Sequence, residues 1–122
     1  MTPDPTDLAR ALWGGALLVA PRRLLADLHQ APAGTLEVGV LRVLGMRHLV
    51  QAAVLAALSD PRARWVGAVV DLLHAGSAVP LAMGRGPRSR AGRVETLAAV
   101  SFAAAELAPA IRRTEPRARP RR

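Results

Sequence analysis

Five polar residues that could do chemistry lie within long apolar stretches of the sequence. They are Arg47, His48, Gln51, Asp71 and His74. An aspartate and histidines in apolar surroundings can pass protons, and two histidines on facing helices can ligate haem iron. An arginine and an aspartate can instead form a buried ion pair that joins two helices. These residue types therefore allow a structural role, a proton pathway or a haem site.

Helical spacing would bring these residues together. Arg47 and Gln51 are four residues apart, and Asp71 and His74 are three residues apart, so each pair lies on one face of a helix. In an antiparallel hairpin of the two helices, the side chain of Arg47 is long enough to reach Asp71. We therefore predict that Arg47 and Asp71 form a buried ion pair. Gln51, His48 and His74 are expected to complete its hydrogen bonds.

Of the three roles, the structural one is expected, because a buried ion pair fixes the register of two helices. Haem ligated by His48 and His74 is disfavoured, since Arg47 and Asp71 crowd the site and only 2% of the residues are aromatic. A small transporter or proton pathway that uses Asp71 and His74 stays open as the alternative.

Four apolar segments separated by arginine-rich stretches must position this cluster. They are rich in alanine and leucine, and none alternates with the period of two that is typical of strands, so each predicts a helix. Pro21 ends the first helix, and Asp60 followed by Pro61 provides an N-cap and a first-turn proline for the third. We therefore predict an all-α protein whose helices cover approximately residues 7–20, 35–58, 61–83 and 93–110.

The length and apolarity of these helices favour a membrane over water. A spanning helix needs about 20 mostly apolar residues, which the last three segments provide and the first does not quite reach. Over residues 65–83 the polar residues are Asp71, His74 and Ser77, so this helix lacks a polar face. A chain of 122 residues is too short to bury such helices in a water-soluble core. We predict a small transmembrane bundle of three to four helices, with residues 1–111 as one domain.

The arginines outside the apolar segments predict the topology and the lipid contacts. All 17 basic residues are arginine, and the formal net charge is +8. If all four segments span, the side of the membrane that holds both termini carries more arginines, Arg10 among them, than the other side. Because positive charge is enriched on the cytoplasmic side, we place both termini in the cytoplasm. The proline-broken segment 112–122 is expected to be disordered and to bind anionic lipids. Nucleic acid is a disfavoured partner because few aromatic residues accompany the arginines.

The remaining residues show no pattern of an enzyme or a cofactor site. The chain has no cysteine, and it lacks the spacings typical of zinc, phosphate and nucleophile motifs. Glu106 is a further candidate for a buried carboxylate, although Pro109 three residues later would also allow it to lie near a frayed helix end and to reach water. We expect Glu95 to reach water. We predict a non-enzymatic structural or accessory membrane protein without cofactor or metal, which can form homo-oligomers. A soluble basic helical bundle that binds an acidic partner is the alternative outside the membrane class.

One stretch of the sequence resembles a known group of proteins. It contains Arg42, Gly45 and Arg47 in the pattern R-x-L-G-x-R and is followed by a helix with Asp71. This pattern is similar to that of an uncharacterised family of small, multi-spanning actinobacterial membrane proteins. The resemblance covers residues 36–83 and implies a membrane location and a small helical bundle, without implying an activity.

Overall fold

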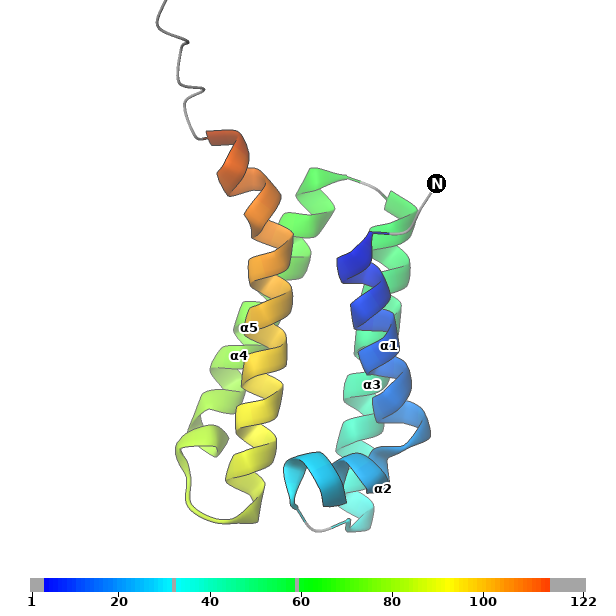
Figure 1. Cartoon of the computed structure of the whole chain (residues 1–122), viewed down its shortest axis with the longest axis vertical. Helices are drawn as coiled ribbons and strands as arrows, with labels where there is room; N and C mark the ends of the chain where they lie inside the picture. Colours follow the sequence, from blue (N-terminus) through cyan, green and yellow to red (C-terminus); the bar gives the residue numbers. More distant parts are fainter. Residues whose placement is uncertain (1–3, 32, 59, 115–122) are drawn as a thin grey trace, which may run out of the picture.

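The computed structural model describes residues 4–31, 33–58 and 60–114, and this part of the chain is almost entirely helical (Figure 1). Its elements are α1 (Pro5–Val19), α2 (Pro21–Arg23), the π-helical turn η1 (Leu24–His29), α3 (Thr35–Leu58), α4 (Pro61–Met83) and α5 (Pro87–Thr114). No strand occurs among the described residues, which confirms the all-α prediction. The predicted count of three to four helices is too low, because the segment after α1 forms α2 and η1.

Capping and proline positions determine where the helices begin. The side chain of Asp4 accepts a hydrogen bond from the backbone N–H of Thr6 at 2.8 Å, and Asp60 accepts one from Arg62 at 2.8 Å. Each cap precedes a first-turn proline, whose fixed φ angle suits the start of a helix. α5 begins at Pro87, six residues earlier than predicted, and continues through Pro109. Residues 112–114 are therefore helical, and the rest of the predicted tail lies outside the described residues.

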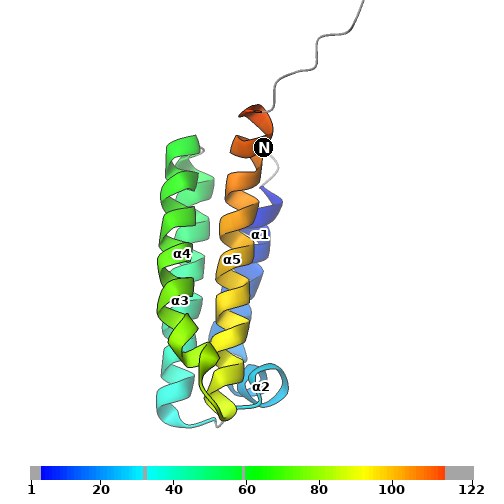
Figure 2. The same cartoon turned by 90° about the vertical axis from the view of Figure 1, so that its left-hand side faces the viewer.

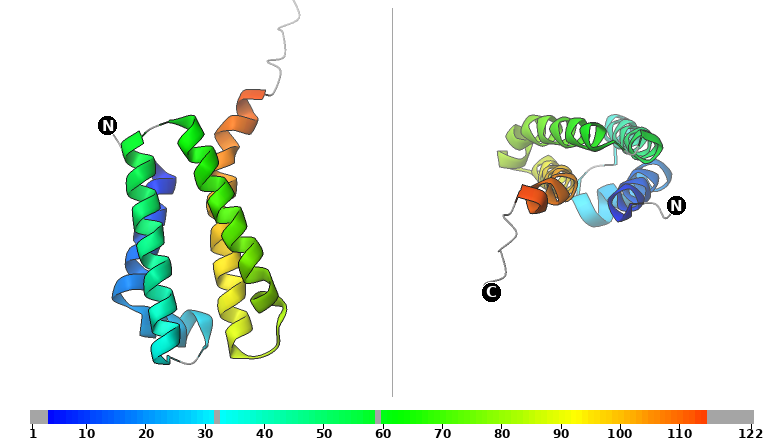
Figure 3. Two further views of the ribbon diagram at one scale, coloured as in Figure 1. Left: turned by 180° about the vertical axis from the view of Figure 1, so that it is seen from behind. Right: turned by 90° about the horizontal axis from the view of Figure 1, so that it is seen from above.

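The long helices form two pairs. α1 packs along α3, and α4 packs along α5, whereas contacts between the pairs are few (Figures 1 and 2). Viewed from behind, α3 and α4 meet at their short connection and diverge away from it (Figure 3). η1 lies at the opposite end of the bundle, against the beginning of α5. α3 and α4 therefore form the expected antiparallel hairpin, but each packs more closely along its other neighbour, α1 or α5.

Side-chain size explains this pairing. A Cβ atom added to Gly14 would lie 2.8 Å from the backbone oxygen of Gly45, so α1 and α3 touch backbone to backbone. Small side chains are also buried where α4 packs along α5, namely Ala68, Ala75, Ala99 and Ala103. Between the pairs, by contrast, long polar side chains such as Arg47 and Gln51 bridge from one helix to the next. Small residues let helices approach closely, and long residues hold them apart.

The bundle carries apolar side chains on its outside and charged ones inside. Arg10 and Asp71 are completely buried, whereas Val19 is 87% exposed and Leu73 is 70% exposed. The described core contains one small cluster of large aliphatic side chains, near α2 and η1, formed by Leu17, Leu25, Val38 and Leu41. α3 and α4 are long and apolar enough to cross a membrane, with mean hydropathies of 1.4 and 1.5. Two helices of the structure thus meet the length and composition criteria for membrane spans.

Candidate functional site

Asp71, halfway along α4, is the centre of the buried polar cluster. Its carboxylate accepts hydrogen bonds from Nη1 of Arg10 at 2.7 Å, from Nη2 of Arg47 at 2.7 Å and from Nε2 of Gln51 at 3.3 Å. These donors come from α1 and α3, so one carboxylate joins three helices of both pairs. Donors to a completely buried carboxylate stabilise its charged form, which apolar surroundings would otherwise disfavour.

Arg10 extends the cluster to the fourth long helix. One arm of its guanidinium group binds Asp71, and the other binds Oε1 of Glu106 on α5. The same guanidinium group lies over the ring of Phe102, 4.6 Å from the ring centroid, which is a cation–π geometry. Two arginines and two carboxylates therefore meet in the interior, and their formal charges balance.

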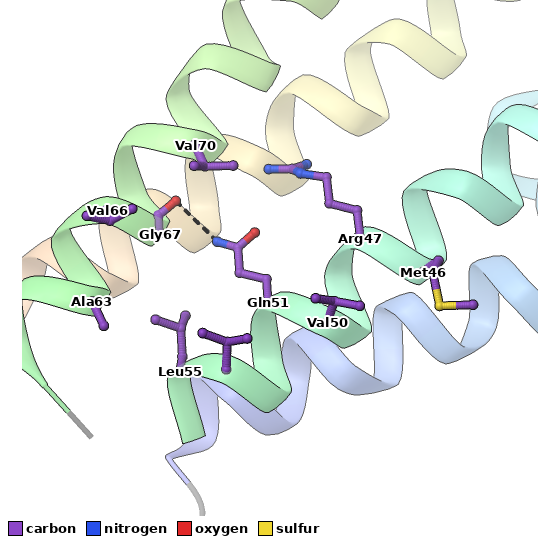
Figure 4. A pocket seen from close by; sticks show the side chains of 10 residues that line it. Met46, Arg47, Val50, Gln51, Leu55, Ala63, Val66, Gly67 and Val70 are labelled. Carbon is purple, nitrogen blue, oxygen red and sulfur yellow. Dashed lines mark hydrogen bonds between the residues drawn. The ribbon is translucent and has the colours of Figure 1, made fainter. Parts of the chain in front are cut away.

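Two of the five predicted cluster residues bind Asp71 as the sequence suggested. Arg47 forms the ion pair, and Gln51 bonds both to Asp71 and, at 3.2 Å, to the backbone oxygen of Gly67 (Figure 4). The two histidines do not complete these hydrogen bonds. Both ring nitrogens of His48, and Nε2 of His74, are buried without a hydrogen-bond partner among the described residues.

Arg10 and Glu106 belong to the cluster, although the sequence did not assign them to it. Arg10 was assigned to the arginines that face one side of the membrane but is completely buried, and Glu106, which was left open between a buried and a water-exposed carboxylate, is buried. A signal for Arg10 is present in the sequence, because Asp7, Arg10, Gly14 and Leu17 recur at helical spacing and form the buried face of α1. For Glu106, Pro109 suggested a position near a frayed helix end at about residue 110, yet α5 continues to Thr114.

A second buried polar pair lies nearer the η1 end. His29 of η1 is completely buried, and its Nε2 lies 3.7 Å from Oε1 of Glu95 on α5, too far for a hydrogen bond. Burial lowers the pKa of His29, so its imidazole is neutral at pH 7. Glu95 is 6% exposed, which corrects the expectation that it reaches water. Neither side chain has a hydrogen-bond partner among the described residues.

Ion pairs also lie toward both ends of the bundle. Arg64, near the start of α4, binds the buried carboxylate of Asp7 at 2.9 Å. At the other end, Arg88 of α5 binds Glu37 of α3 at 2.7 Å. Buried or half-buried polar groups therefore recur along the whole length of the bundle, between the two helix pairs.

The outer face between α3 and α4 is hollowed into an apolar groove of about 390 Å³. Met46, Val50, Val66 and Val70 line it, while Arg47 and Gln51 reach across from α3 to α4 (Figure 4). Among the described residues, no group of three His, Asp or Glu side chains could hold a metal ion. The interior thus combines balanced charges with unpaired polar atoms, which suits either a structural network or a hydrated path.

Comparison with protein-family models, with curated proteins and with solved structures found no match for this chain. The resemblance to a family of actinobacterial membrane proteins therefore stays a prediction.

Proposed function

We propose that this chain is an integral membrane protein whose long helices span the bilayer, and that it acts as a non-enzymatic structural or accessory bundle. The observation that supports this proposal is the inverted distribution of side chains. In water, exposed aliphatic side chains on every long helix would be unfavourable, and so would an interior built from charged residues. In a bilayer the same exterior faces lipid, and the charged interior is the expected place for polar groups.

In this proposal, the buried network around Asp71 holds the helices together. Helices in lipid gain little from burying apolar surface, so close packing and polar contacts must hold them together. Asp71, Arg10, Arg47 and Glu106 link α1, α3, α4 and α5 at one level of the bundle. We propose further that both termini lie in the cytoplasm, that the C-terminal arginines bind anionic lipids and that the chain assembles with itself or with another membrane protein.

Fractionation tests the membrane location directly. We expect the protein to stay in the pelleted membranes when they are washed with alkaline carbonate, which strips peripheral proteins, and to be released by detergent. The apolar exterior predicts this result because detaching the bundle would expose that surface to water. Recovery of the protein in the carbonate supernatant would overturn the proposal and would favour the soluble basic bundle with an acidic partner.

A proton pathway is the second candidate function, and the unpaired buried polar atoms favour it. Glu106 Oε2, both oxygens of Glu95 and the ring nitrogens of His29 and His48 have no hydrogen-bond partner among the described residues. Such atoms need water inside a bilayer, and hydrated carboxylates and imidazoles pass protons. Asp71, the relay residue suggested by the sequence, is less suitable because it already accepts three hydrogen bonds.

Vesicle measurements distinguish the two functions. If the chain conducts protons, vesicles containing it will dissipate a pH gradient faster than protein-free vesicles under a clamped membrane potential. Glu95→Gln is expected to abolish that excess rate, whereas Glu37→Gln, which removes a carboxylate from a peripheral ion pair, should keep it. A wild-type rate equal to that of protein-free vesicles would exclude the pathway and leave the structural role.

A further inference from the structure

Three arginines gather at the corner where α1 ends and α2 begins. Arg22 and Arg23 of α2 and Arg42 of α3 line one pocket of about 380 Å³. Val19, Ala20 and Pro21 form its remaining lining. Residues from sequence positions 19–23 and from position 42 thus build one basic pocket with an apolar side.

These arginines differ from the arginines that form ion pairs elsewhere in the bundle. Arg22, Arg23 and Arg42 are exposed, and within the described part of the chain none forms an ion pair. Arg47 and Arg88, by contrast, bind carboxylates. The pocket therefore holds three like charges that repel one another, and an anion placed among them would relieve that repulsion.

Arg42 is the residue for which this pocket matters most. It lies seven residues into α3, about 10 Å along the helix from Thr35, within a segment apolar enough to cross a membrane. The nearest carboxylate along its own helix belongs to Glu37, which already binds Arg88. An arginine at such a depth needs either an anion or a route to the membrane surface.

The apolar side of the pocket indicates where this corner lies in the bilayer. Val19 is a large exposed aliphatic residue at the end of α1, two residues before Pro21 and the two arginines that follow it. A boundary between an aliphatic side chain and guanidinium groups is typical of the lipid interface, where acyl chains meet phosphate groups. Guanidinium groups bind phosphate oxygens through two parallel hydrogen bonds. An arginine therefore recognises a phosphate group more specifically than a lysine does.

We propose that Arg22, Arg23 and Arg42 form a binding site for the phosphate group of an anionic lipid. This inference rests on the proposed membrane location. The phosphate accepts hydrogen bonds from the guanidinium groups, while the acyl chains lie along the apolar surface beside Val19. A free phosphate ion offers the same chemistry to the arginines but has nothing to place on the apolar side, so the lipid is the occupant that fits both parts of the pocket.

The test uses the purified full chain in neutral detergent micelles, to which phosphatidylglycerol, phosphatidylcholine or inorganic phosphate is added. Native mass spectrometry measures how much lipid is retained, and thermal unfolding measures the stabilisation that binding causes. We expect phosphatidylglycerol to be retained and to raise the Tm of the wild type. Arg42→Gln should lose most of this retention and of the Tm shift. Arg62→Gln, at an exposed arginine of α4, is the matched control and should keep both.

Two outcomes would overturn the site. Equal losses in Arg42→Gln and Arg62→Gln would mean that total charge, and not this pocket, attracts the lipid. A Tm shift from inorganic phosphate as large as that from the lipid would assign the pocket to a free anion. A second variant, Arg22→Gln with Arg23→Gln, should reproduce the loss while far-ultraviolet circular dichroism stays unchanged. Because retention is measured in micelles, its failure is distinct from release of the protein by carbonate, which would overturn the membrane location.

Discussion

Asp71→Asn is expected to destabilise the bundle by about 3–5 kcal/mol, because it removes one partner from a buried ion-pair network. The substitution leaves the size of the side chain nearly unchanged and removes its negative charge. Arg47 then loses the carboxylate that it binds, and Arg10 keeps only Glu106. The interior would then hold two guanidinium groups and one carboxylate, and the guanidinium group of Arg47 would lack a partner, which is costly in a low-dielectric interior.

Unfolding in mixed micelles, followed by circular dichroism as a denaturing detergent is added, measures this loss. The amount of protein in the membrane should fall too, because a few kcal/mol is a large fraction of a typical folding free energy. Asp27→Asn is the matched control, since Asp27 is exposed on η1, and it should leave stability and abundance unchanged. If Asp71→Asn were as stable and abundant as the wild type, the network would not hold the helices together.

Gly45→Ala is expected to destabilise the contact between α1 and α3 by about 1–3 kcal/mol through overpacking. A Cβ atom at residue 45 would lie 2.6 Å from the backbone oxygen of Gly14 and 3.0 Å from Cβ of Leu17. A backbone oxygen cannot rotate away as a flexible side chain can, so the two helices must separate. Their separation would also move Arg10 of α1 relative to Asp71.

Gly39→Ala is the matched control, because Gly39 lies on the same helix as Gly45. A Cβ atom there would have nothing within 4 Å, so the substitution adds helix propensity without a clash. We expect Gly39→Ala to be neutral or to stabilise by up to about 1 kcal/mol, opposite in sign to Gly45→Ala. The same denaturation experiment compares the two variants. Equal effects at both positions would contradict the close approach of α1 and α3.

The sequence by itself determined the helical class, both boundaries of α3 and of α4, and part of the polar cluster. Apolar segments rich in alanine and leucine could form only helices, and Asp60 with Pro61 began α4 where predicted. The ion pair of Arg47 with Asp71 followed from a local argument, since each residue was out of place in its own apolar segment. Such reasoning works because periodicity and local charge are properties of neighbouring residues.

Only the tertiary structure decided which helices pair and which charges meet. Sequence order predicted the hairpin of α3 and α4, but not that α3 packs more closely against α1, where Gly14 and Gly45 let the two backbones touch. Arg10 and Glu106 are 96 positions apart, and no local pattern relates them. Two helices approach closely only where their surfaces are complementary, and these surfaces come from segments far apart in the sequence. The resulting arrangement of helices then decides which distant charges meet. The sequence therefore indicated that buried charges need partners, and helix packing selected the partners.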